Sequence, residues 1–83
     1  MTSELIQKFV ENKSRKGEEV KIHFKQRPSV SGIFINGKDY EELKSKNFWR
    51  IVNSNVAEEW KRTANIDLAR IFSGMAFTRL TEQ

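Results

Sequence analysis

The chain has 83 residues, which suffice for a single domain (1–83) but not for two. A hydrophobic content of 37% and an aromatic content of 11% exclude a disordered chain, and no run approaches the roughly 20 apolar residues of a membrane span, so we expect no membrane partner. With no cysteine, the chain has neither a disulfide framework nor a thiolate metal site, which fits a reducing cytoplasm.

The N-terminal residues predict a helix over 2–14. Its apolar positions recur at the spacing of one helical face, and Thr2 or Ser3 can act as the N-cap. We expect the helix to fade in the polar run at 12–16 and to end by Gly17.

From Glu19 the hydrophobic period changes from that of a helix to two. The apolar residues Val20, Ile22 and Phe24 alternate with Lys21, His23 and Lys25, which is typical of a half-buried strand. Residues 27–29, with Pro28, predict a tight connection to a second strand over 30–35. Gly32 inside that strand indicates a bulge, a bend or a close backbone approach. We therefore expect an antiparallel hairpin.

The rest of the chain predicts short helices and three more strands. Residues 39–44 favour one or two helical turns with Asp39 near the cap, and 48–52 favour a central strand covered on both faces. The segment 55–72 fits both a strand period and a helical period; we expect a helical insertion around 55–65 and a strand over 66–72. A turn at 73–74 then leads to a last strand over 76–80. The fold class is α+β and mainly β.

Residues suited to catalysis are scarce. His23 is the single histidine and lies on the polar side of its predicted strand. The neighbouring acids at 41–42 and 58–59 split between opposite faces, so they do not form a general acid/base couple, and no glycine pattern predicts a phosphate loop. We expect no enzymatic activity and no metal or cofactor.

The positive charge is concentrated in the first half of the chain. Residues 13–50 carry ten Lys/Arg and five Asp/Glu, so their net charge of +5 exceeds the +4 of the whole chain. This distribution favours an anionic partner such as nucleic acid, although solubility alone accounts for a few net charges. Most aromatic residues fit core packing. Tyr40 lies among three lysines and fits either base stacking or a helix anchor.

The order of elements and two short motifs are similar to those of the Sm-like family of small β-barrels, which includes the Sm, LSm and Hfq proteins. Gly74, Phe77 and Leu80 occupy the glycine and hydrophobic positions of the second motif, while Ser73 stands where many Sm proteins have arginine. Gly32 with its following hydrophobic residues, Asp39, and Asn47 before the third strand resemble the first motif, although Asp39 comes one residue late. The resemblance implies a strongly bent, SH3-like barrel of five strands over 19–80.

The resemblance also implies a function, namely an oligomeric, non-enzymatic module that binds RNA or single-stranded nucleic acid. A barrel this small leaves its fourth and fifth strands with unpaired backbone groups, and copies would form a homo-oligomeric ring by pairing these edge strands. The candidate nucleic-acid contacts are Tyr40, Lys46, Asn47, Ser73 and Gly74, with basic support from Lys13, Arg15 and Lys16. The alternative, which the acidic pairs and the balanced C-terminal half favour, is a protein-interaction or assembly module without a nucleic-acid role.

Overall fold

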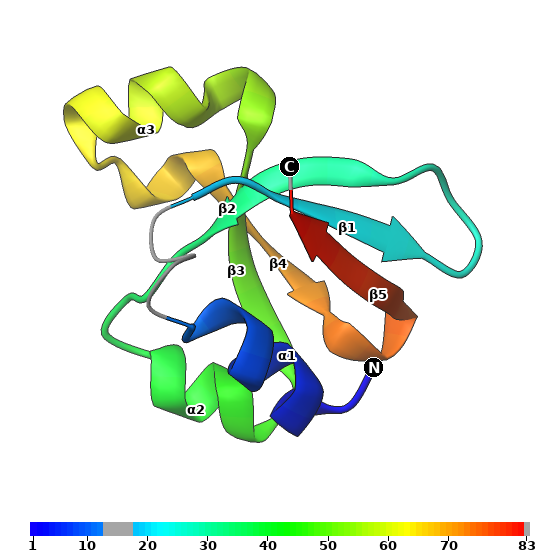
Figure 1. Ribbon diagram of the computed structural model, residues 1–83. Helices are drawn as coiled ribbons and strands as arrows, with labels where there is room; N and C mark the ends of the chain where they lie inside the picture. The colour runs from blue at the N-terminus through cyan, green and yellow to red at the C-terminus, as the bar shows by residue number, and fades with distance from the viewer. Residues whose placement is uncertain (13–17, 83) are drawn as a thin grey trace.

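A computed structural model describes residues 1–12 and 18–82 of the chain (Figure 1). The helices are α1 (Ser3–Val10), α2 (Tyr40–Ser45) and α3 (Ala57–Thr63), and the short 3₁₀ turns are η2 (Ser54–Val56), η3 (Ile66–Leu68) and η4 (Gly74–Ala76). The strands are β1 (Val20–Phe24), β2 (Val30–Phe34), β3 (Phe48–Asn53), β4 (Ala69–Ser73) and β5 (Phe77–Glu82). Within these described ranges, no helix is long and apolar enough to cross a membrane.

The predicted N-terminal helix is confirmed, with a different end. The Leu5 amide donates to the Thr2 hydroxyl at 3.3 Å, so Thr2 is the N-cap, and Ile6 is fully buried beneath the helix. The Glu11 amide donates to the Gln7 carbonyl at 2.9 Å and closes the last turn. The helix therefore ends at Val10 and not at the predicted residue 14, because polar side chains at 11–12 give it no further apolar face to bury.

The five strands form one antiparallel sheet in the order β4-β3-β2-β1-β5. This confirms the predicted α+β class and the β1–β2 hairpin, in which Val20 faces Gly32. The sheet is not closed into a barrel, since β4 and β5 are its two edges, the fourth and fifth strands that the Sm-like resemblance leaves unpaired within one copy. Between these strands the 3₁₀ turn η4 leads the chain from β4 to the opposite edge of the sheet, where β5 pairs with β1.

Apolar side chains pack on both faces of the bent sheet. One cluster contains Ile6, Val20, Ile22, Trp49, Ile51, Phe77 and Leu80, and residues of α1 and α2 pack against it. The other contains Ile33, Ile35, Val52 and Ala57, with Trp60 of α3 packed against it. β3 contributes to both clusters, which confirms its prediction as a strand covered on two sides.

The ambiguous segment after β3 contains both a helix and a strand. The helical insertion predicted around 55–65 is confirmed as η2 and α3, while the next strand begins at Ala69 and not at residue 66. Ala64 ends α3 in the left-handed conformation at φ 53°, and the Asn65 side chain then accepts from the Asp67 amide at 3.0 Å to start η3. This local hydrogen bond delays the strand by three residues. The last strand begins at Phe77 and continues to Glu82, beyond the predicted 76–80.

Gly32 marks a close backbone approach, one of its three predicted roles. A Cβ atom at this position would lie 2.6 Å from the Val52 carbonyl oxygen and 2.8 Å from Cγ2 of Ile51. Because the nearer obstacle is backbone, only a residue without a side chain allows β2 to pair with β3 in this register.

Candidate functional site

The structure brings three of the predicted contact residues together. Ser73 lies opposite Phe48 in the β3–β4 pairing, and the Gly74 amide donates to the Asn47 carbonyl at 2.8 Å. Lys46 is exposed at the end of α2, while Tyr40 lies at the other end of that helix. The predicted basic residues Lys13, Arg15 and Lys16 lie outside the described residues.

The Asn47 side chain is occupied within the chain itself. Its Nδ2 donates to the Met1 carbonyl at 2.9 Å, and its Oδ1 accepts from Nε1 of Trp49 at 2.8 Å. A Cβ atom on Gly74 would collide with the Asn47 side chain and would lie 2.6 Å from Cδ1 of Ile6. Asn47 and Gly74 thus join the N-terminal segment, β3 and η4, and the two hydrogen bonds fix the amide group of Asn47 against Met1 and Trp49.

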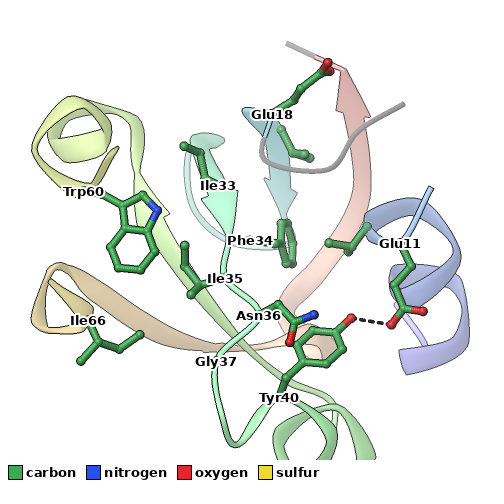
Figure 2. Close-up of a pocket in the computed structure, with 12 residues that line it drawn as sticks. Glu11, Glu18, Ile33, Phe34, Ile35, Asn36, Gly37, Tyr40, Trp60 and Ile66 are labelled. Carbon is green, nitrogen blue, oxygen red and sulfur yellow. Dashed lines mark hydrogen bonds between the residues drawn. The ribbon is translucent and has the colours of Figure 1, made fainter. Parts of the chain in front are cut away.

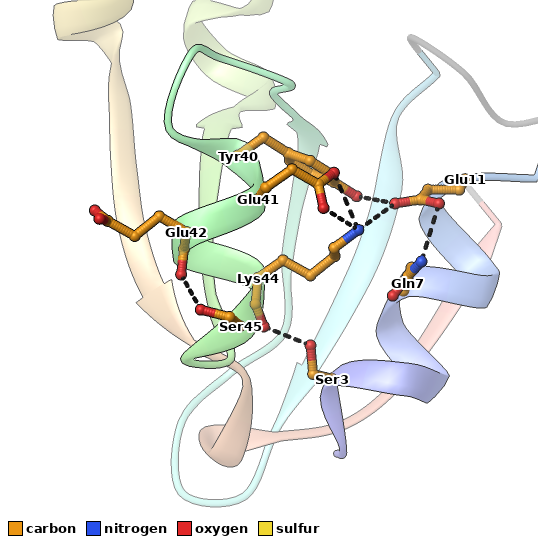
Figure 3. A network of polar contacts seen from close by, with 8 residues as sticks. All are labelled: Ser3, Gln7, Glu11, Tyr40, Glu41, Glu42, Lys44 and Ser45. Carbon is orange, nitrogen blue, oxygen red and sulfur yellow. Dashed lines mark hydrogen bonds and ion pairs between the residues drawn. The ribbon is translucent and has the colours of Figure 1, made fainter.

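Tyr40 belongs to a polar network between α1 and α2 (Figure 3). Its hydroxyl donates to a Glu11 carboxylate oxygen at 2.6 Å, and Lys44 Nζ lies 3.5 Å from the same oxygen and 2.9 Å from Glu41. The Tyr40 ring also packs edge-to-face on Trp49, with 6.0 Å between ring centroids. These are the contacts of a helix anchor, the second of the two roles predicted for Tyr40.

The same network shifts the pKa values of its members. The hydrogen bond from Tyr40 is the main cause of the lowered pKa of Glu11. The contacts of Glu11 with Gln7 and Lys44 lower this pKa further. Burial, followed by the Glu11 carboxylate, raises the pKa of Tyr40 far above its usual value. Tyr40 therefore stays a neutral donor and Glu11 a charged acceptor at neutral pH.

Asp39 also serves the fold. Its side chain makes no capping hydrogen bond to α2; instead Oδ2 accepts from Nη2 of Arg50 at 2.5 Å. The predicted cap position is therefore right, while the carboxylate ties the loop before α2 to β3.

A basic strip, defined as Lys21, His23, Lys25 and Arg79, follows β1 and β5; Lys25 comes directly after β1, beyond a shift of the β1–β5 register between His23 and Phe24. These two strands lie side by side in Figure 1. His23 is directly opposite Arg79 in the antiparallel register, and Lys21 is two residues from His23 on the same side of β1. Lys21, Lys25 and Arg79 are exposed, and within residues 1–12 and 18–82 none of them forms an ion pair.

Desolvation and the positive charges of the strip both lower the pKa of its histidine, His23. Desolvation lowers the pKa of His23, and the charges of Arg79 and Lys21 lower it further. The ring shares a hydrogen bond with the Thr81 hydroxyl at 3.2 Å, which holds it against β5. An anion bound here would relieve the repulsion among these side chains.

The sequence analysis did not identify this strip as a site. The alternation of Lys21, His23 and Lys25 is visible in the sequence, but Arg79 is more than 50 positions away and joins them only through the β1–β5 register. The strip could have been identified only from the pairing of the first strand with the last, which no local sequence pattern indicates.

Within the described ranges, no group of three or more His, Asp or Glu side chains is placed to hold a metal ion. A scan of protein-family models, a search of curated proteins and a search of solved structures each find no match to this chain.

Proposed function

We propose that the protein is a non-enzymatic module that binds RNA or another single-stranded nucleic acid through the basic strip. The observation that carries the proposal is the alignment of Lys21, His23 and Arg79 on one exposed side of two paired strands. Cations without acidic partners attract a phosphate backbone because its binding releases condensed counterions.

The strip suits a polyanion better than a single phosphate. Residues two apart along a strand are separated by about 6.5 Å, close to the spacing of successive phosphates in an extended single strand, and the partner strand adds a second row. The Ser31 and Thr81 positions lie opposite Lys21 in the two neighbouring strands and place hydroxyl-bearing residues beside the cations. The proposal retains the Sm-like resemblance, with the contacts moved from Tyr40 and Asn47 to this strip.

Fluorescence anisotropy with labelled oligo-U and oligo-A, at 50 and 200 mM salt, tests the proposal. With Lys21, Lys25 and Arg79 each neutralising one phosphate, a single strand should bind about 20-fold more weakly at the higher salt, since the logarithmic slope is about −0.7 per contact. The double variant Lys21→Gln/Arg79→Gln retains one contact, and its affinity should change only about three-fold over the same range.

The control is the double variant Lys61→Gln/Arg62→Gln on α3, which removes the same charge from exposed positions away from the strip. It should bind like the wild type. Equal loss in both double variants would show that only net charge matters, and absence of binding at micromolar wild-type protein would reject the proposal.

A second candidate function, assembly with further copies of this chain, is favoured by the open edges of the sheet. The outer edge of β4 is unpaired, and three large apolar side chains near it are exposed: Ile71 by 52%, Phe48 by 38% and Met75 by 69%. An exposed apolar edge strand is a template for pairing with another chain, here with the equally open β5 of a second copy.

Light scattering of the purified protein tests this assembly. The wild type and the hairpin control Gln26→Lys should exceed the mass of one chain, and Ile71→Lys should return to that mass, because a lysine on an edge strand opposes pairing. A wild type that stays monomeric up to millimolar protein would reject assembly through these edges.

A further inference from the structure

A small pocket lies between the β1–β2 hairpin and the turn η4. Its volume is about 200 Å³, and its wall is formed by Phe24, Lys25, Gln26, Arg27 and Ala76. The Lys25 amide donates to the Ala76 carbonyl at 3.0 Å, so a backbone hydrogen bond fixes the two sides of the pocket relative to each other. Lys25 also belongs to the basic strip, and this hairpin pocket therefore adjoins the end of the strip.

The hairpin pocket presents an aromatic ring and a guanidinium group together. The guanidinium carbon of the exposed Arg27 lies 4.7 Å from the ring centroid of Phe24 and 5.8 Å from that of Phe72. Phe24 is half-buried, and its ring packs edge-to-face on the fully buried Phe77 with 5.4 Å between centroids. The core therefore holds the Phe24 ring in place, and this ring in turn supports Arg27 at the surface.

These groups are the ones with which proteins bind unpaired bases. Aromatic rings and guanidinium planes stack on bases, and the amide of a glutamine can donate to and accept from one adenine. Phe24, Arg27 and Gln26 supply one group of each kind. The pocket is smaller than the roughly 300–1,000 Å³ of most small-molecule sites, which favours a single planar ring system.

A larger pocket of about 350 Å³ opens where β2 passes between α3 and the α1–α2 pair (Figure 2). The wall that the described residues form there contains none of the four residues of the basic strip. Its tyrosine is also occupied, because the Tyr40 hydroxyl donates to Glu11 at 2.6 Å. The hairpin pocket is thus the better placed of the two for a base whose phosphate lies on the strip.

We propose that the hairpin pocket binds one unpaired base, with a preference for adenine, of a single strand whose phosphates lie on the basic strip. The base packs against Phe24 and the Arg27 guanidinium, and Lys25 contacts the adjoining phosphate. Adenine is preferred because a purine offers more stacking surface than a pyrimidine and pairs with the Gln26 amide. The inference rests on the proposed nucleic-acid function and adds a site for a base to a strip that recognises only phosphate.

Three DNA strands of equal length separate base binding from phosphate binding: they are abasic throughout, or abasic except for one central adenine or one central thymine. In fluorescence anisotropy at 50 mM salt, the adenine should raise the affinity about ten-fold over the abasic strand, the effect of one stacked base, and the thymine should raise it less. Equal binding of all three strands would reject the base site and leave the function of the strip intact. Binding of none of them would reject both.

Arg27→Lys keeps the charge and removes the guanidinium plane at an exposed position, so it tests stacking without threatening the fold. It should reduce the ten-fold advantage of adenine to about three-fold and leave the affinity for the abasic strand unchanged. The control Arg62→Lys makes the same change at an exposed position of α3 and should retain the whole advantage. An Arg27→Lys protein with the wild-type advantage would overturn the proposal.

The position of the base can be read from ¹H–¹⁵N correlation spectra of the wild type with each strand. The shifts that the adenine strand causes beyond those of the abasic strand should centre on residues 24–27 and Ala76. Additional shifts centred instead on the Trp60 indole, in the wall of the larger pocket, would overturn the assignment of the site.

Discussion

Replacing Asn47 separates a structural role from a binding role for a residue that the Sm-like resemblance assigns to nucleic acid. The Asn47 amide joins the Met1 carbonyl to the indole of Trp49, whose side chain is only 1% exposed. Asn47 also adopts the left-handed conformation at φ 60°, which asparagine tolerates better than alanine. Asn47→Ala therefore loses a hydrogen-bond partner and introduces backbone strain together.

The two losses can be estimated separately. A buried indole N–H left without an acceptor costs about 1–3 kcal/mol, and alanine in the left-handed region costs about 1 kcal/mol more. Asn47→Ala should thus lower the free energy of unfolding by about 2–4 kcal/mol, a large part of the total for a chain of this size. Asn47→Gly loses only the side-chain contacts, so it should be about 1 kcal/mol more stable than Asn47→Ala.

Urea denaturation followed by circular dichroism measures these differences, and anisotropy on the folded variants measures nucleic-acid affinity. Asn53→Ala serves as a control, because Asn53 caps an exposed turn by accepting from the Asn55 amide, and its loss should cost about 1 kcal/mol. An Asn47→Ala protein with the wild-type urea midpoint but greatly weakened nucleic-acid binding would refute the structural reasoning and restore Asn47 as a contact residue.

Three further changes test other parts of the fold. Gly32→Ala would place a methyl 2.6 Å from the Val52 carbonyl oxygen, so urea denaturation should show a loss of about 1–3 kcal/mol. Ala64→Gly relieves the left-handed residue at φ 53°, and calorimetry should show a melting temperature higher by about 4–8 °C. Because the folded-state pKa of Glu11 is lowered below 4.5, the contribution of Glu11 to stability is complete above pH 4.5 and is lost as the pH falls through the folded-state pKa. Thermal unfolding between pH 7 and pH 3 should therefore show a smaller decrease in melting temperature for Glu11→Gln than for the wild type.

Features set by neighbouring residues were predictable from the sequence. The Thr2 cap, the alternation in β1 and the hairpin with β2 each depend on contacts within about 15 residues, and all three are confirmed. The two-sided burial of β3 was also predictable, since apolar residues on both faces of a strand leave no face for water.

Features set by contacts between residues far apart in the sequence were not predictable from local patterns. The pairing of β5 with β1 joins strands more than 50 positions apart, and only the resemblance, not a local pattern, indicated that the fourth and fifth strands are the edges. Asn47 has a plausible binding pattern in the sequence, but its partner Met1 lies 46 positions away and is visible only in the structure. The hairpin pocket likewise joins residues 24–27 to Ala76, and no local pattern connects them.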